Sequence, residues 1–258
     1  MKIENPECSG RTRSGVRASA ASSWAGALLL IALGVWLCGP GPKPADASSE
    51  GANISAPTPV RAARLMPNDL SPSLRAALER EGDAGRGQDA YTPCAVCHMS
   101  GGGGHSDGTF PQLAGQHASV IIKQLIDIRE GRRANPLMLP FANRLSGSQE
   151  VADVALYVSL LPDSEENGKG TGQDLILGAE LYGRDCASCH GARGEGDAAR
   201  LIPVLAGQHY GYMLRQIRNI GAGRRGNAHP DMVSLAAGYS DAELMALVDY
   251  ASRIRDAN

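Results

Sequence analysis

The chain has 258 residues, of which 43% are hydrophobic, and its formal net charge is −2 at pH 7. This balance is ordinary for a protein of one or two folded domains, and it lacks the basic excess that binding to nucleic acid requires. We therefore expect no nucleic-acid partner.

The first 47 residues are predicted to form an export signal. Basic residues precede an apolar run over residues 24–37, and a cleavage site between small residues follows at 45–47. The run of about 14 apolar residues is shorter than the roughly 20 that a membrane-spanning helix needs. We expect residues 1–47 to be removed and the mature chain to be periplasmic. An uncleaved anchor is the alternative.

Residues 48–82 are predicted to form an N-terminal extension before the first domain. The segment is rich in Ala, Pro and Ser, and one helix is expected from Pro72 to Glu81. Ser71 is its predicted N-cap, and Pro72 occupies the first helical position, where no N–H is needed. We expect the extension either to dock on a domain or to stay mobile.

Two Cys-x-x-Cys-His strings carry the strongest chemical signal in the chain. They begin at Cys94 and at Cys186, an offset of 92 residues. Two thiols three positions apart can each form a thioether to one porphyrin, while the adjacent imidazole reaches its iron. Cys-x-x-Cys also occurs in zinc ribbons and redox pairs, but their spacing of roughly 15–20 residues and their βαβ context are missing here. The strings therefore predict two covalently bound haem c groups, attached through Cys94, Cys97, Cys186 and Cys189.

Cysteine usage agrees with this prediction. Of the 6 cysteines, Cys8 and Cys38 fall in the segment that we expect to be removed, and the other four belong to the two motifs. Free thiols tend to be oxidised outside the cytoplasm, so a count without remainder fits consumption of both pairs by haem. Lipidation at Cys38 is disfavoured, because bulky Trp36 and Leu37 precede it where a lipidation signal wants small residues.

The offset of 92 residues persists beyond the motifs and indicates a tandem duplication. Pro-x-Leu-Ala-Gly-Gln-His occurs at residues 111–117 and again at 203–209. The second copy gains two residues near His229. No alternating strand pattern of useful length occurs, so the fold is expected to be all-α. The predicted parts are domain 1 at 83–161, a polar glycine-rich linker at 162–173 and domain 2 at 174–258.

Each copy is predicted to open and to close with a helix. The opening helix carries Gly-x-x-x-Tyr and ends near Tyr91 or Tyr182, which precede their cysteines by three and four residues. Pro93 is expected to end the first of these helices early. The closing helices have an apolar stripe and carry Tyr157 and Tyr250.

His98 and His190 are the predicted proximal ligands, because they directly follow the second cysteine. Met138 and Met232 are the predicted sixth ligands, 40 and 42 residues beyond those histidines at equivalent points of the repeat. Each follows Pro-x, which is expected to hold an extended loop against the distal face. An isolated methionine more often only packs, but these two match each other. Iron with His and Met ligands has a high potential and passes electrons rather than binding substrate.

Further residues are candidates for supporting each haem. Pro111 and Pro203 follow their histidines by the same 13 residues, so a backbone carbonyl there could accept the Nδ1 proton and fix the ring. Simple turn prolines are the alternative. Two arginine pairs are candidate partners of the propionates, with solvated surface positions as the alternative; these are Arg132, Arg133, Arg224 and Arg225.

Four other histidines are expected to have minor roles. His117 and His209 begin the helix after the Leu-Ala-Gly turn and are expected to be structural. His105 and His229 are unpaired between the copies, and either is a rival iron ligand, although we expect both to face solvent.

The twin haem motifs, the Pro-x-Leu-Ala-Gly-Gln-His strings and the Gly-Arg-Arg to Pro-x-Met loops resemble the dihaem cytochrome c4 family over roughly residues 83–254. The resemblance implies two tandem cytochrome c-like domains that face each other across a pseudo-twofold axis. It also implies a non-enzymatic periplasmic carrier that takes single electrons from a quinol-linked complex or dehydrogenase to an acceptor such as a terminal oxidase. Redox proteins are the expected partners, and membrane association would come through a partner or an uncleaved anchor. The extension at 48–82 departs from the family's usual pattern.

Two other functions stay open. The chain could be the cytochrome subunit of a periplasmic complex that oxidises sulfide or thiosulfate, which co-purification with a catalytic subunit would reveal. Direct catalysis, as in dihaem peroxidases or thiosulfate dehydrogenases, needs an iron with an open or unusual ligand position. The paired methionines argue against it, while the insertion beside His229 leaves it open.

Overall fold

A computed structural model describes residues 70–164 and 166–254. The predicted export signal at 1–47, with Cys8 and Cys38, and the first part of the extension lie outside the described residues. Within them the fold is all-α as predicted, and one isolated β-bridge joins Asp197 and Ile202. No helix in this part of the chain is long and apolar enough to cross a membrane.

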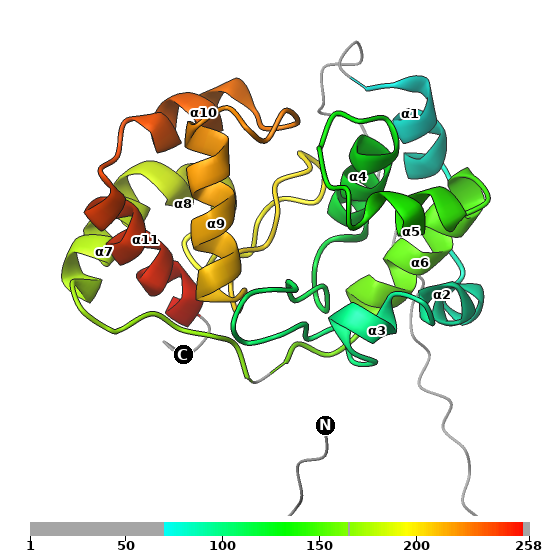
Figure 1. Ribbon diagram of the computed structural model, residues 1–258, viewed down its shortest axis with the longest axis horizontal. Coiled ribbons are helices and arrows are strands. Elements are labelled where there is room, and N and C mark those ends of the chain that lie inside the picture. The colour runs from blue at the N-terminus through cyan, green and yellow to red at the C-terminus, as the bar shows by residue number, and fades with distance from the viewer. Residues whose placement is uncertain (1–69, 165, 255–258) are drawn as a thin grey trace, which may run out of the picture. The chain divides into compact units, whose positions relative to one another are not determined.

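The first copy packs its helices around α6 (Figure 1). Both α2 and α4 contact α6, and their apolar side chains form one buried core with those of α6. The helices of this part are α1 (Pro72–Leu78), α2 (Ala84–Tyr91), α3 (Ala95–His98), α4 (Ala118–Arg129), α5 (Leu139–Arg144) and α6 (Ser148–Leu160).

The second copy repeats this arrangement with α11 in the place of α6 (Figure 1). The α7 helix packs on α11, and α9 packs on both α10 and α11. Its elements are α7 (Leu175–Leu181), the π-helical turn η1 (Tyr182–Cys186), α8 (Ala187–His190), α9 (Tyr210–Gly221), α10 (Pro230–Ala237) and α11 (Asp241–Arg253).

A glycine lets the opening helix of each copy lie against the closing one. A Cβ on Gly87 of α2 would lie 2.1 Å from the backbone oxygen of Asp153 in α6. A Cβ on Gly178 of α7 would lie 2.2 Å from the backbone oxygen of Ala246 in α11. Any side chain would force the two backbones apart, so the glycine of the Gly-x-x-x-Tyr pattern is required by the helix packing.

The two copies enter their haem motifs differently, as the tyrosine spacing predicts. Helix α2 ends at Tyr91, before Pro93, and a turn leads to Cys94. Helix α7 instead runs on into η1, which reaches Cys186 without a break. A π-helical turn accommodates one more residue than an α-helical turn, so η1 takes up the extra residue of the second copy.

The extension contributes one docked helix, α1. The Ser71 side chain accepts a hydrogen bond from the Leu74 N–H, which confirms the predicted N-cap, although the helix ends at Leu78 and not at Glu81. Leu74, Ala77 and Leu78 are buried in the core of the first copy. The α1 helix is therefore part of that copy's core.

The segment expected to be a linker is tied to the second copy by its backbone. The N–H groups of Gly170 and Gly172 donate to the Asp249 carboxylate at 3.0 and 2.7 Å. The Asn167 side chain donates to Ser252 O at 2.6 Å. These bonds fix the chain along α11 before α7 begins.

Reciprocal hydrogen bonds join the two copies. The Gln208 side chain receives the N–H of Gln112 at 3.0 Å and donates to the Gln112 carbonyl at 2.8 Å. Its repeat counterpart Gln116 binds Val204 in the same way. The Gln116 side chain accepts the Val204 N–H at 3.0 Å and donates to the Val204 carbonyl at 3.1 Å. Gln112 and Val204 are themselves 92 positions apart.

A second reciprocal pair is made by histidines. His117 Nε2 lies 2.9 Å from Glu195 O, and His209 Nε2 lies 2.7 Å from Gly103 O. Both histidines therefore bind the backbone of the opposite copy, in agreement with their expected structural role. These contacts also repeat at the offset of 92, so each copy binds the other through equivalent residues. The two copies are therefore related by pseudo-twofold symmetry.

Candidate haem sites

Each haem motif forms a single helical turn. Cys94 is the N-cap of α3, and its carbonyl accepts the His98 N–H at 2.9 Å. This turn presents two thiols three positions apart and a histidine directly after them. Burial raises the pKa of the Cys94 thiol, and it raises the pKa of Cys186 in the second copy to about 11. Both thiols are thus uncharged at neutral pH.

A backbone carbonyl orients each predicted proximal histidine. His98 Nδ1 lies 3.0 Å from Pro111 O, and His190 Nδ1 lies 3.0 Å from Pro203 O. Since a carbonyl can only accept, Nδ1 carries the proton and Nε2 keeps the lone pair that a metal needs. Burial lowers the pKa of both imidazoles, although the bonds to the carbonyls oppose it, and this favours the neutral ring.

A glycine turn brings each of these carbonyls into place. Gly104 has φ +67°, and a Cβ there would lie 2.4 Å from Phe110 O. Its N–H donates to His98 O at 3.1 Å, which folds the loop back over the motif. Gly196 does the same in the second copy, with φ +68° and a bond of 2.7 Å to His190 O.

A tyrosine holds the end of each motif. The Tyr91 hydroxyl donates to Met99 O at 2.9 Å, and the Tyr182 hydroxyl donates to Gly191 O at 2.8 Å. Each ring also packs against the tyrosine of the closing helix, with centroids 5.5 and 5.6 Å apart. The tyrosines thereby link the motif to the helix crossing beneath it.

In the first copy the candidate residues line one cavity of about 370 Å³. Cys94, Cys97, His98 and Pro111 lie on its wall together with Met138. Apolar side chains complete the wall; these include Leu113, Ile121, Leu125, Ile128, Phe141, Leu145, Val154 and Val158. The cavity thus combines thiols, an imidazole and a thioether within an apolar enclosure.

The Pro-x pattern led us to expect an extended loop at each predicted sixth ligand. The structure instead places both methionines at the start of a helix. Met138 is the N-cap of α5 with helical dihedrals, φ −84° and ψ −21°. Met232 lies in the first turn of α10, which begins at Pro230. Proline is well suited to the first helical position, because its φ is preset and its missing N–H has no partner there. Both methionines are half-buried.

The four candidate arginines do not share one environment. Arg133, Arg224 and Arg225 line the cavity of the first copy. Arg132 is not on that wall: its Nε donates to Asp127 at 2.7 Å, and its guanidinium pairs with Glu130. The structure therefore brings three of the four to the first haem site.

The second copy also supplies residues that sequence reasoning missed. Tyr212, Arg215, Gln216 and Asn219 of α9 line the cavity of the first copy. Arg133 donates to the Tyr212 hydroxyl at 3.0 Å, and the Arg215 guanidinium lies 5.5 Å from that ring's centroid. Alignment of the two copies offered one signal for these residues. At the position of apolar Val120 the second copy has Tyr212, which carries a polar hydroxyl.

These residues give one end of the cavity a positive charge. Its wall carries four arginines and no carboxylate. Burial raises the pKa of the Tyr212 hydroxyl, but the neighbouring Arg133, Arg225 and Arg215 more than offset it, so the pKa lies below its ordinary value. Burial and the like charge of Arg133 lower the pKa of Arg225 to about 10.

The first site therefore fits a haem c group. The apolar walls match the porphyrin faces, the thiols match its vinyl edge, and the arginines match its propionates. His98 and Met138 would hold the iron, and Arg133, Arg224 and Arg225 the propionates. A haem c bound here supplies one-electron redox chemistry at its iron.

The rival histidines have other contacts. The His229 side chain is 70% exposed, and its Nδ1 accepts the Asp231 N–H at the start of α10. His105 is exposed and stacks on Phe110, with ring centroids 5.5 Å apart. Neither histidine lines the first cavity.

Comparisons with known proteins agree with the class of protein that this fold and site define, a pair of haem-binding domains. The cytochrome c family model matches the chain twice, at residues 84–161 and 175–253. The chain is 36% identical to cytochrome c4 of Thiocapsa roseopersicina over 185 residues, which are 68% of this chain and 95% of that protein. It is 34% identical to the thiosulfate dehydrogenase electron acceptor of Stutzerimonas stutzeri over 196 residues, 69% of this chain and 90% of that protein.

Solved structures also match the chain. Reduced recombinant cytochrome c4 from Pseudomonas stutzeri matches with a TM-score of 0.60 and 30% identity, over 66% of this chain and 98% of that chain. Thiosulfate dehydrogenase from Marichromatium purpuratum matches with a TM-score of 0.58 and 29% identity, over 66% of this chain and 40% of that chain.

The chain belongs to the cytochrome c family and, within it, to the dihaem cytochrome c4 proteins. It is an electron carrier and not an enzyme, it carries two haem c groups, and its partners are redox proteins.

Proposed function

We propose that this carrier works in the periplasm, between a respiratory donor and an acceptor such as a terminal oxidase. The donor would be a quinol-linked complex or a periplasmic dehydrogenase. The cavity of the first copy carries the proposal, because it brings His98 and Met138 into one apolar enclosure. His98 and Met138 would both hold the iron, which would leave no coordination position for a substrate.

A direct test is a spectroscopic redox titration of the purified holoprotein. Two low-spin haems with methionine-to-iron charge transfer, both at high potential, are expected. Met138→Ala and Met232→Ala should each abolish the charge-transfer band of one haem and lower its potential, because a thioether favours ferrous iron. Met99→Ala is the matched control, since Met99 is a partly exposed methionine next to the first motif. Retention of both bands in either ligand variant would remove that methionine from the site.

Thiosulfate oxidation supplies a second candidate for the electron donor. The relative in Stutzerimonas stutzeri is named a thiosulfate dehydrogenase electron acceptor, and a thiosulfate dehydrogenase is among the matching structures. In this case the chain would be the redox partner or cytochrome subunit of such an enzyme.

Stopped-flow reduction separates the two donors. The oxidised holoprotein is mixed either with a quinol-cytochrome c oxidoreductase and quinol, or with a thiosulfate dehydrogenase and thiosulfate. Reduction of both haems within one catalytic turnover of a donor identifies it. Co-purification with the dehydrogenase would favour a permanent subunit over a diffusing carrier.

The proposed compartment rests on the pattern in residues 1–47. Cell fractionation followed by N-terminal sequencing is expected to give a periplasmic holoprotein that begins near Ser48. A chain recovered in the membrane fraction with residues 1–47 attached would replace this proposal with an anchored carrier. Release from the membrane together with a partner would instead indicate association through that partner.

A further inference from the structure

The two sides of the interface carry different charges, although their contacts repeat. At one group of equivalent positions the first copy has two cations and two carboxylates, whereas the second copy has two cations and no carboxylate. The four positions of the first copy are Lys123, Asp127, Glu130 and Arg132. Their equivalents 92 positions later are, in the same order, Arg215, Asn219, Ala222 and Arg224.

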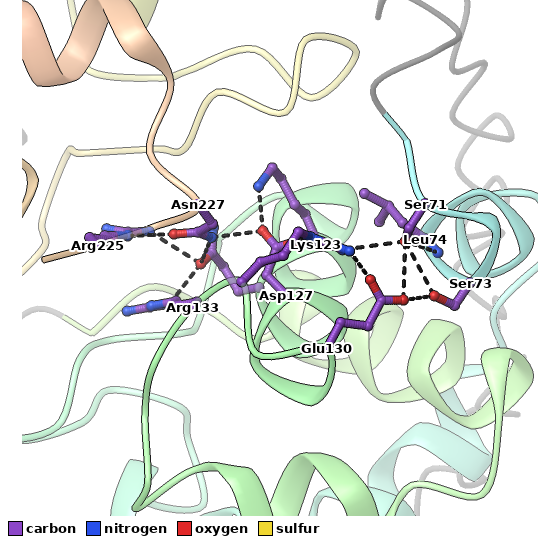
Figure 2. A network of polar contacts seen from close by, with 11 residues as sticks. Ser71, Ser73, Leu74, Lys123, Asp127, Glu130, Arg133, Arg225 and Asn227 are labelled. Carbon is purple, nitrogen blue, oxygen red and sulfur yellow. Dashed lines mark hydrogen bonds and ion pairs between the residues drawn. The ribbon is translucent and has the colours of Figure 1, made fainter. Parts of the chain in front are cut away.

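In the first copy both cations pair with carboxylates. Figure 2 shows the contact between Lys123 and Asp127. Asp127 has a side chain that is 1% exposed, and it pairs with Lys123 and with Arg132. Arg132 also pairs with Glu130. Burial raises the pKa of Asp127, but hydrogen bonds from Lys123, Asn227 and Arg132 more than offset it, so the carboxyl is charged at neutral pH.

In the second copy the equivalent arginines bind neutral oxygen acceptors. Arg224 Nε donates to the neutral Asn219 Oδ1 at 2.9 Å, and Arg215 donates to Gly108 O at 2.7 Å. Among the described residues no carboxylate forms an ion pair with either arginine. Both arginines line the first haem cavity.

Asn219 lines the first haem cavity, and the repeat relation between the copies places its counterpart Asp127 toward the second haem site. Asp127 Oδ2 accepts a hydrogen bond of 2.7 Å from Asn227 of the second copy (Figure 2). Asn227 is the repeat counterpart of Asn135, which lines the first cavity. The reciprocal glutamine and histidine contacts extend this equivalence across the interface.

We propose that Asp127, assisted by Glu130, makes the two haem sites electrostatically unequal and lowers the potential of the second haem relative to the first. Ferric haem carries one positive charge more than ferrous haem, so nearby cations favour reduction. The first cavity is lined by Arg215 and Arg224, which have no carboxylate partner among the described residues, whereas the equivalent cations Lys123 and Arg132 are paired with carboxylates. This difference biases a single electron toward the first copy. The inference rests on the proposed one-electron function.

Reciprocal variants test the proposal in the holoprotein. Asp127→Asn should raise the potential of the second haem more than that of the first, by about tenfold in electron partition, or about 59 mV for a one-electron couple. Asn219→Asp should lower the potential of the first haem more than that of the second. Arg224 already supplies a hydrogen-bond donor at this position, so the new carboxylate has a partner.

Two further measurements complete the test. Asp89→Asn, at an exposed position of α2, removes a charge elsewhere and should leave the separation of the potentials unchanged. The two redox transitions are assigned with Met138→Ala and Met232→Ala. If Asp127→Asn does not fold, Asn219→Asp still decides the matter.

Equal shifts of both haems, or no shift, in the reciprocal variants would overturn the inference and leave the carrier function intact. A wild-type protein without two high-potential haems would overturn the carrier function itself.

Discussion

At the scale of single residues, Gly87 and Gly178 set the distance between the opening and closing helices. Replacing Gly87 with alanine should lower the free energy of unfolding by about 3 kcal/mol, because the added methyl meets a backbone oxygen that cannot move aside. Denaturant titration followed by circular dichroism measures this loss.

Gly183 offers a matched control for this substitution. It lies in η1, and a Cβ there would meet no atom within 4 Å. Gly183→Ala should therefore be neutral or stabilise the protein by up to about 1 kcal/mol. Equal losses in the two variants would show that the close helix crossing does not cause the effect.

Asp127 makes stability depend on pH in acid. Its pKa is lower in the folded protein than in the unfolded chain, so its contribution is fully present above the unfolded value of about 3.9 and is lost as pH falls through the folded value. The unfolding free energies of wild type and Asp127→Asn should therefore differ by a constant amount between about pH 5 and 7 and converge below about pH 4. Asp89→Asn, at an exposed position of α2, is the control for loss of a surface carboxylate. Denaturant titrations over this pH range measure the difference, and a gap that widens in acid would contradict the assigned direction.

At the scale of secondary-structure elements, the α1 helix depends on its cap. The Ser71 Oγ accepts the Leu74 N–H and also donates to Glu130 at 3.1 Å. Ser71→Ala should cost about 1 kcal/mol, because the first-turn N–H loses its acceptor. Hydrogen exchange at Leu74 should accelerate, while exchange in α11 stays unchanged. Ser100→Ala, an exposed position, is the control. Unaltered protection at Leu74 would show that burial of Leu74 and Leu78 alone holds the helix.

The π-helical turn shows how an element absorbs a difference in length. The second copy has one residue more between its tyrosine and its cysteine, yet both tyrosines bond the carbonyl that follows their motif. Because η1 takes up that residue locally, the insertion does not change the relation between helix and haem motif.

At the scale of the whole molecule, paired backbone contacts join the two copies. Gln208 is buried and satisfies both the N–H and the carbonyl of buried Gln112. Gln208→Leu should lower the free energy of unfolding by about 2–4 kcal/mol, because two buried backbone groups lose their partners. Calorimetry measures the loss. Gln88→Leu, exposed on α2, is the control and should have little effect. A Gln208 variant as stable as the control would mean that water replaces the glutamine.

The sequence by itself determined the chemistry and the architecture. A cysteine pair and a histidine within five positions can serve one haem whatever the surroundings, and a repeat at a constant offset implies two similar domains. The capped start of α1 was also predictable, because an N-cap depends on residues adjacent in the chain.

Only the tertiary structure decided which residues of one copy serve the other. Tyr212, Arg215 and Asn219 reach the first haem cavity from α9, while Arg132 is held on Asp127 away from it. Residues more than 70 positions apart meet there. Neither the spacing of motifs nor helix propensity indicates which surfaces of the two copies pack together. The charge difference across the interface lies in single substitutions between equivalent positions. Its effect depends on which site each position faces, and that is a property of the packed pair of copies.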